Sequence, residues 1–374
     1  LPAEPKIFHG REVELADILK LFNETNPRIA ILGAGGMGKT SLSMAVLHHS
    51  KIATKYGTNR FFIPCDGSTN KVDLAGLIGA HLGLKPGKDL TKAVLRHLDN
   101  APPTLLVLDN LDTLWDPAKY RKEIEEFLSL LTDITSLALV ITMRGVERPA
   151  QVKWTQPFLS PLEPLAHDAA QRMFLDIADD GHSLEEVNQI LAVTDNMPLV
   201  ISLLAHLVDT EGCSAILSRW EVEKTSLLSE GYDKRSNLEL SISLSLSSAR
   251  MISVPHAQHL LSLLAMLPDG LSDTELKHAK FPIKDILSCK AVLLRTALAY
   301  TDDHKRLKAL IPIMEYMQRL LPATDEMIKP LFTHFQELLE LYVVNVGQTS
   351  GVLAISQISL NVANIENLLR HVLQ

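Results

Sequence analysis

A glycine-rich loop near the amino terminus constrains the fold of this chain more than any other segment. Residues 33–40 read Gly-Ala-Gly-Gly-Met-Gly-Lys-Thr and match the phosphate-binding pattern G-x-x-x-x-G-K-[ST] at every fixed position. An apolar run at 28–32 precedes the loop, and a good helix former at 41–47 follows it. This context suits phosphate binding, because backbone N–H groups and the positive end of the helix converge on the phosphate oxygens. The sequence therefore predicts a P-loop that binds a nucleoside diphosphate or triphosphate.

Each part of the loop has an expected contact with the nucleotide. Lys39 is expected to reach the β- and γ-phosphates, and the Thr40 hydroxyl is expected to ligate Mg²⁺. Glycines let the backbone approach the phosphates closely, since they carry no Cβ. The expected nucleotide-contacting residues of this segment are Gly33, Gly35, Gly36, Met37, Gly38, Lys39, Thr40 and Ser41.

Two later apolar runs end in side chains that suit the same site. Residues 104–109 end in Asp109, the Walker B pattern in which the carboxylate holds Mg²⁺. Residues 137–144 end in Arg144, whose guanidinium is placed to sense the γ-phosphate. The alternatives are a turn aspartate after a buried strand and an arginine paired with a surface carboxylate. Because both runs follow a phosphate loop, we expect Asp109 to be a metal ligand and take Lys39, Asp109 and Arg144 as the candidate catalytic residues.

The residue after Asp109 argues for slow hydrolysis. Efficient ATPases often carry a second acid there, as a base for the attacking water, and this chain has Asn110. An amide orients water but does not accept its proton. Asp112, three residues past Asp109, is an alternative candidate for the base. The sequence therefore predicts at most a slow ATPase, which suits a switch better than a motor.

Length and composition indicate two or three globular domains. The chain has 374 residues, 46% hydrophobic and 21% charged, and a formal net charge of −8. This acidic balance gives no general attraction to nucleic acid or to anionic membranes. The three cysteines lie far apart without metal-ligand spacing, as expected for buried thiols in a reducing, cytoplasmic setting. No apolar stretch reaches the length of a membrane span.

The pattern of apolar runs divides the chain into four parts. Strands expected at 28–32, 60–64, 104–109 and 136–142 alternate with helical segments, which predicts an α/β P-loop domain with a parallel, AAA+-like sheet at 1–160. Amphipathic segments predict a helical domain at 161–235. Helices, including one at 282–289, and two strand-like runs around Asp302-Asp303 predict a winged-helix domain at 236–325. Residues 326–374 are expected to begin a helical, tetratricopeptide-like C-terminal region.

Taken in order, the motifs resemble the NB-ARC family of STAND ATPases. That family contains plant disease-resistance receptors, the animal apoptosome scaffold and fungal NLR-like proteins. The matching segments lie within roughly residues 5–325 and are Phe8-His9-Gly10-Arg11-Glu12, the phosphate loop, Leu105–Asp109, Ile141–Arg144 and Met197-Pro198-Leu199. The stretches 109–115 and 364–367 look most like fungal members.

The resemblance implies an adenine nucleotide, ADP or ATP, bound with Mg²⁺. It also implies that Phe8 and Arg11 lie beside the adenine and that Pro198 covers the nucleotide from the helical domain. The winged helix of the family usually carries a Met-His-Asp triplet whose histidine contacts the ADP β-phosphate, and residues 310–315 of this chain lack it. His304 and Arg306 are the candidate substitutes for that contact.

The resemblance further implies a signalling switch of the kind used in innate immunity. ADP would hold a closed state, and exchange for ATP would open the chain and permit assembly into a homo-oligomer. Further partners would be an effector domain upstream and a repeat sensor downstream in the same longer protein, without nucleic acid. Two alternatives stay open, a conventional AAA+-type ATPase with real turnover and a transcription regulator that reads DNA. The second needs several basic or amide side chains on one helix face, and residues 282–295 are mostly apolar.

Overall fold

The computed structural model describes residues 1–65, 70–85, 87, 89–178, 181–228, 238–344 and 349–373. The chain divides into two compact units. Unit 1 consists of Leu1–Ala192 and Asn196–Leu217, and unit 2 consists of Val193–Asp195 and Ser218–Gln374. The helical domain predicted at 161–235 crosses the boundary between the units at Leu217, and the sequence-based division into four domains stays a prediction.

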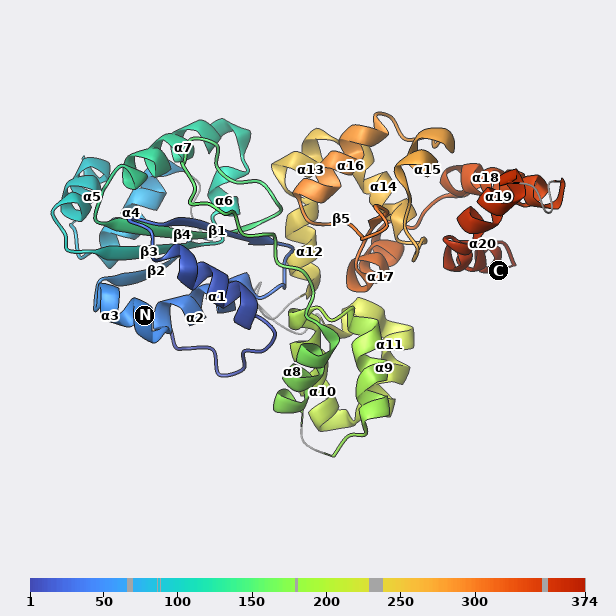
Figure 1. Ribbon diagram of the computed structural model, residues 1–374, viewed down its shortest axis with the longest axis horizontal. Helices are drawn as coiled ribbons and strands as arrows, with labels where there is room; N and C mark the ends of the chain where they lie inside the picture. The colour runs from blue at the N-terminus through green and yellow to red at the C-terminus, as the bar shows by residue number, and fades with distance from the viewer. Residues whose placement is uncertain are drawn as a thin grey trace. The chain divides into compact units, whose positions relative to one another are not determined.

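A four-stranded parallel sheet forms the centre of unit 1 (Figure 1). Its strands are β1 (Arg28–Gly33), β2 (Arg60–Pro64), β3 (Thr104–Asp109) and β4 (Leu137–Arg144), and they lie in the order β1-β4-β3-β2. A parallel bridge between Gly33 and Leu162 extends the sheet beyond β1. The strands are nearly continuous apolar runs, as expected where helices cover both faces of a parallel sheet. The parallel α/β architecture predicted from the sequence is therefore confirmed.

Helices cover the sheet on both faces. In Figure 1 one face carries α1 (Glu12–Leu21), α2 (Lys39–His48) and α3 (Ser50–Tyr56). The opposite face carries α4 (Lys71–His81), α5 (Leu90–Asp99), α6 (Asp112–Trp115) and α7 (Ala118–Thr132). The helix expected from residues 41–47 is α2, and a separate helix, α3, follows it because the backbone of His49 is extended, with a ψ of 135°.

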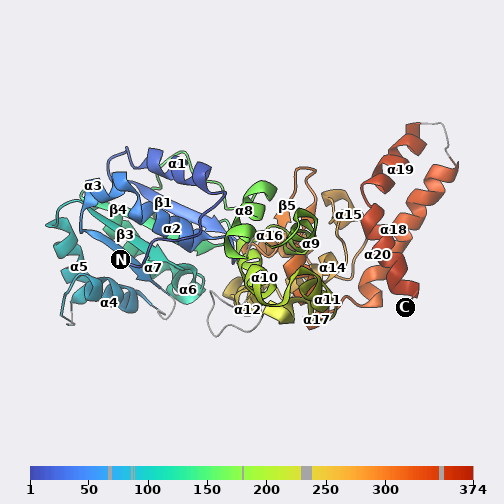
Figure 2. The same ribbon diagram turned by 90° about the horizontal axis from the view of Figure 1, so that it is seen from below.

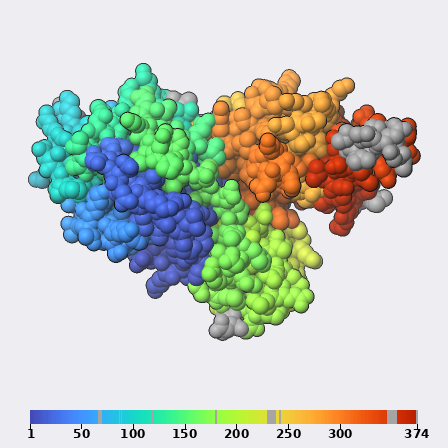
Figure 3. All heavy atoms as spheres, viewed as in Figure 1, coloured from blue at the N-terminus to red at the C-terminus, as the bar shows by residue number. Residues whose placement is uncertain are grey.

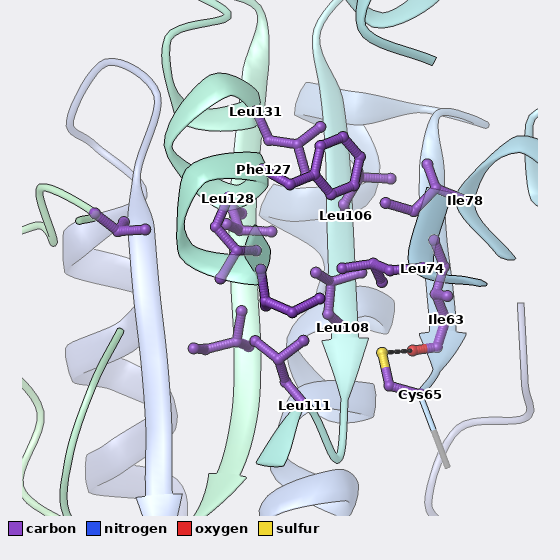
Figure 4. Packing of buried hydrophobic residues seen from close by; sticks show 14 of the residues in the cluster. Ile63, Cys65, Leu74, Ile78, Leu106, Leu108, Leu111, Phe127, Leu128 and Leu131 are labelled. Atoms are coloured by element: carbon purple, nitrogen blue, oxygen red, sulfur yellow. Dashed lines mark hydrogen bonds between the residues drawn. The ribbon is translucent and has the colours of Figure 1, made fainter. Parts of the chain in front are cut away.

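Apolar side chains between the sheet and α4 and α7 hold the second face together. Figure 4 shows Phe127 and Leu131 of α7 pointing toward Leu106 of β3, while Leu74 of α4 lies beside Leu108. These side chains are fully buried, and burial of each contributes roughly 1.5–3 kcal/mol. This core fixes the carboxyl ends of β3 and β4, where the candidate site residues lie.

Helices follow the sheet within unit 1. They are α8 (His167–Ile177), α9 (Leu184–Thr194), α10 (Pro198–Glu211) and α11 (Cys213–Glu223), which continues into unit 2. The first residues of the chain, dark blue in Figure 3, lie against the green atoms of this helical part. His9 Nε2 is 2.5 Å from Asp176 Oδ2 on α8, and a Cβ on Gly10 would come within 2.5 Å of the Ala169 Cβ.

The described residues of unit 2 are helical apart from one short hairpin. Its first helices are η1 (Lys224–Leu228), α12 (Leu238–Leu246), α13 (Ala249–Ser253), α14 (His256–Leu264), α15 (Asp273–His278), α16 (Ile286–Arg295) and α17 (Ile311–Leu320). The antiparallel strands β5 (Tyr300–Thr301) and β6 (Leu307–Lys308) form the hairpin between α16 and α17. Leu307 also pairs with Leu271, so three segments meet at this small sheet.

The helix predicted at 282–289 was wrong at both ends. Asp285 precedes the first residue of α16 and has a φ of 51°. This left-handed conformation interrupts a right-handed helix, so α16 begins after it. The helix then runs on through an apolar stretch to Arg295.

Three helices close the described part of the chain. They are α18 (Asp325–Val344), α19 (Thr349–Ser359) and α20 (Val362–Leu373), and Figure 2 shows them side by side. Arg306 on the hairpin is buried and donates hydrogen bonds to the Gly270 carbonyl and to Asn361 Oδ1, directly before α20. The guanidinium also lies 3.2 Å from Glu275 Oε2. Arg306 therefore has a structural role within unit 2. No helix in the described part of the chain combines the length and hydropathy that a membrane crossing requires.

Candidate nucleotide-binding site

The phosphate loop joins the end of β1 to the start of α2. Gly36 and Gly38 have φ angles of 79° and 84°, in the left-handed region that favours glycine. Gly38 is the N-cap of α2, so Lys39 and Thr40 are the first residues of that helix. The N–H groups of the first helical turn have no partner within the helix, and they carry the positive end of its dipole. The loop and the helix together offer a cradle for an anion.

Lys39 is buried beside the loop backbone. Its side-chain ammonium donates to the carbonyls of Gly33 at 3.0 Å and Ala34 at 2.6 Å. Burial is the main cause that lowers the pKa of Lys39 to about 8, and the nearby Arg144 cation acts in the same direction. Asp112 and Asp109 partly oppose this shift. A phosphate anion at the loop would stabilise the charged form of this lysine.

Thr40 and Asp109 bring two hard oxygen ligands together. Asp109 ends β3 and is fully buried, and the Thr40 hydroxyl donates to its two carboxylate oxygens at 2.9 and 3.1 Å. Neighbouring ligands of octahedral Mg²⁺ stand about 3 Å apart, because each lies about 2.0–2.1 Å from the ion. The pair therefore fits a Mg²⁺ ion. Mg²⁺ in such sites is commonly held by one or two protein oxygens together with phosphates and waters. Among the described residues, no group of three or more acidic, cysteine or histidine side chains is placed to hold a metal.

A second hydroxyl, which the sequence analysis did not identify, contacts the same carboxylate. Thr142 on β4 is fully buried, and its Oγ1 donates to Asp109 Oδ1 at 2.6 Å. The same oxygen accepts the backbone N–H of Asn110 at 3.0 Å. Asn110 has a φ of 56°, so the chain turns sharply after Asp109. One sequence signal was available: Thr142 is a polar residue within an otherwise apolar run, but such a residue is common in strands.

Arg144 and Asp112 form a pair at the end of β4. The Arg144 backbone N–H donates to Asp112 Oδ1 at 3.2 Å, and its Nε lies 3.9 Å from Asp112 Oδ2. Their side chains are only 14% and 12% exposed. Asp112 therefore carries an ion pair, and activation of water by its carboxylate would compete with that pair.

The segment Met197–Leu199 packs directly on the phosphate loop. The Leu199 backbone N–H donates to the Gly36 carbonyl at 3.1 Å. A Cβ on Gly36 would come within 2.8 Å of Met197 Cε and 2.9 Å of Leu199 Cβ. Pro198, between these residues, is buried and begins α10. The structure thus places residues 197–199, one of the segments that carry the family resemblance, beside the phosphate loop.

Arg11 supports the loop from another direction. Its side chain is buried and donates to the carbonyls of Met37 at 3.1 Å and Glu163 at 2.5 Å. The Arg11 Nε is buried without a hydrogen-bond partner among the described residues. The contacts of Phe8 and Arg11 with adenine remain predictions.

The residues predicted for the site come from separate parts of unit 1. The structure brings the loop, which contains Lys39 and Thr40, together with Arg11 and Asp109. Met197 and Leu199, the neighbours of Pro198, contact Gly36 of the loop, and the Arg144 cation helps to lower the pKa of Lys39. Thr142 is the addition that the sequence analysis missed. The arrangement can hold a phosphate chain and a divalent cation at the carboxyl edge of a parallel sheet, where α/β proteins commonly bind ligands.

A family model described as Novel STAND NTPase 1 matches residues 2–245. STAND denotes signal transduction ATPases with numerous domains. The match covers more than half of the chain, which therefore belongs to this family. The uncharacterized proteins Mb0918 of Mycobacterium bovis and Rv0894 of Mycobacterium tuberculosis are 28% identical over 211 residues, 54% of this chain and 51% of each relative. The matched region thus spans about half the length of these curated relatives.

Two solved structures resemble this chain to different degrees. The Walker-type ATPase PABY2304 of Pyrococcus abyssi superposes with a TM-score of 0.60 at 14% identity, covering 85% of this chain and 98% of that one. A STAND protein with a tetratricopeptide repeat sensor, PH0952 of Pyrococcus horikoshii, gives a TM-score of 0.39 at 15% identity, over 98% and 54% of the two chains. The first of these similarities supports the P-loop, AAA+-like architecture.

Proposed function

We propose that this chain is a molecular switch that binds ADP or ATP with Mg²⁺ and turns ATP over slowly. The observation that carries the proposal is the convergence of Lys39, Thr40 and Asp109 beside one glycine-rich loop. The buried Lys39 ammonium suits the negative phosphates, and the Thr40 hydroxyl and Asp109 carboxylate suit the Mg²⁺ ion that accompanies them. Membership in a STAND NTPase family supports a nucleotide-binding, switch-like ATPase.

The proposal of slow hydrolysis depends on the residues that face the attacking water. Asn110 cannot take a proton from water, and the carboxylate of Asp112 pairs with Arg144. General-base catalysis typically contributes about 10²–10⁴-fold to a rate. Without a free base, nucleotide exchange would control the switch more than hydrolysis does.

The contact between α10 and the loop supports a role in switching. A ligand shifts a conformational equilibrium only by its differential affinity for the two states. The Leu199 N–H binds the Gly36 carbonyl, so a change in the loop on nucleotide binding acts directly on the start of α10. We propose that Arg144 adds discrimination between ATP and ADP through the γ-phosphate.

The finer parts of the proposal come from the resemblance to NB-ARC proteins. They are an NLR-like signalling role of the innate-immunity type, an ADP-closed and an ATP-open state, and homo-oligomerisation of the second. They also include a winged-helix part, a repeat sensor and an effector in the longer protein, and no nucleic-acid partner. The buried thiols of Cys65, Cys213 and Cys289 are consistent with the reducing, cytoplasmic setting that we propose.

The first experiment identifies the bound nucleotide. The purified chain is denatured, and the released nucleotide is separated by chromatography, with Lys39→Ala as the matched variant. Stoichiometric ADP from the wild type and none from the variant is the expected result for a closed switch. An empty wild-type site that takes up ATP and turns it over rapidly would favour the AAA+-type motor instead. A wild type that binds neither ADP nor ATP would refute both.

A further inference from the structure

We infer that Thr142 is a positioning residue of the magnesium site. Its hydroxyl fixes the orientation of the Asp109 carboxylate. The inference rests on the proposed function, because it concerns the Mg²⁺ that accompanies the nucleotide. Thr142 does not have to touch the ion, since its hydroxyl acts through the carboxylate that would hold it.

The first step of the argument is the geometry of the carboxylate. Asp109 Oδ1 accepts the Thr142 hydroxyl at 2.6 Å and the Thr40 hydroxyl at 2.9 Å. When Thr40 turns its oxygen toward a cation, the bond from Thr142 can persist, because it comes from the neighbouring strand of the sheet. Thr142 then prevents the carboxylate from rotating away from the ion.

The second step is the position of the Thr142 hydroxyl itself. Its oxygen accepts the Asn110 backbone N–H at 3.0 Å while its proton goes to Asp109. The Thr142 carbonyl accepts the Leu111 backbone N–H at 3.0 Å. These bonds fasten the turn after β3 to β4. Donor and acceptor roles of the hydroxyl are both used, so its orientation is defined.

The third step is burial. Thr142 and Asp109 are both fully buried, so water cannot readily replace a lost hydroxyl contact. Removing a group that hydrogen-bonds to a metal ligand commonly lowers the metal affinity by about 10–100-fold. The hydroxyl of Thr142 is placed to have such an effect, whereas a merely structural threonine would affect stability alone.

The experiment measures ADP binding by isothermal titration calorimetry on nucleotide-free protein, in EDTA and over a series of Mg²⁺ concentrations. The variants are Thr142→Val, which removes the hydroxyl at nearly constant shape, and Thr142→Ser, which retains it. Thr104→Val is the matched control, because Thr104 is a buried threonine on β3 whose hydroxyl donates to the Pro102 carbonyl instead.

Mg²⁺ should raise the affinity for ADP, and we call the Mg²⁺ concentration that gives half of this increase the midpoint. For Thr142→Val we expect the midpoint to rise about tenfold, with ADP affinity in EDTA close to that of the wild type. Thr142→Ser should restore the wild-type midpoint, and Thr104→Val should not shift it. The inference is overturned if Thr142→Val leaves the midpoint unchanged, if Thr104→Val shifts it equally, or if affinity falls by the same factor with and without Mg²⁺. It is also overturned if wild-type binding does not respond to Mg²⁺. A wild type that binds no nucleotide refutes the proposed function itself, which separates the two failures.

Discussion

Raising the pH from 7 to 9 should weaken ADP binding about tenfold, because Lys39 loses its proton in the nucleotide-free protein. Burial, reinforced by Arg144, lowers the pKa of Lys39 to about 8. The phosphates of bound ADP stabilise the charged ammonium and should return its pKa toward the ordinary value of about 10.4. At pH 7 the lysine is charged with and without ADP, whereas at pH 9 binding must be accompanied by uptake of a proton.

The size of the effect follows from linkage. With a pKa of about 8 in the free protein and above 10 in the complex, about nine-tenths of the free protein must gain a proton to bind ADP at pH 9. This costs roughly 1.4 kcal/mol, a factor of about ten in affinity. The sign is fixed: affinity is highest below pH 8 and falls as the pH rises through the pKa of the free protein.

Calorimetry in buffers of different ionisation enthalpy tests this reasoning directly. At pH 8.5, binding of ADP should take up about 0.8 proton, and the phosphate groups contribute little there because their pKa lies near 6. Lys39→Met should bind more weakly and show no such uptake. A wild-type affinity that is level from pH 7 to 9, or the same slope in Lys39→Met, would refute the assignment of the proton to Lys39.

Three substitutions test other parts of the site. Asn110→Asp should raise ATP turnover, measured as phosphate release, because it supplies a base beside Asp109; an unchanged rate would mean that activation of water is not limiting. Asp112→Asn should reduce the preference for ATP over ADP in competition binding, since it weakens the pair that holds Arg144, and it should not add to the effect of Arg144→Ala. Gly36→Ala should lower the free energy of unfolding by about 1–3 kcal/mol in denaturant titrations, because it combines a positive φ with contacts to α10. Gly57→Ala is the control, with a φ of 53° and open space around its Cβ; an equal loss there would leave only backbone strain as the cause.

The sheet could be predicted because its signal is local. Each strand is a short apolar run bounded by turn residues, and among the helices between the strands α5 and α7 have a clear amphipathic pattern. The phosphate loop was equally readable, since its spacing reflects the shape of one backbone segment. In contrast, the start of α16 depends on the left-handed backbone of Asp285. The identity of this residue does not by itself predict that conformation.

The partners of the loop could not be predicted from the residues alone. Met197 and Leu199 approach Gly36 only after the chain has folded back over more than 150 residues, so no local pattern encodes the contact. Thr142 is similar, because its role comes from a hydroxyl that reaches a neighbouring strand. The resemblance to a family drew attention to residues 197–199, but the structure supplies the bond to Gly36 that gives them a physical role.

Four carbonyl groups of the phosphate loop accept hydrogen bonds from donors outside the loop backbone. The carbonyls of Gly33 and Ala34 accept from the Lys39 ammonium, that of Gly36 accepts the Leu199 N–H, and that of Met37 accepts from Arg11. An anion nest requires that N–H groups face the ligand while carbonyls face elsewhere. Of the three donors, only the Lys39 side chain is expected to exchange its carbonyl partners for phosphate, whereas Arg11 and the start of α10 can keep theirs. The two distant segments therefore preorganise the loop without needing to touch the nucleotide, and the affinity of the loop for phosphate depends on how firmly α10 is held.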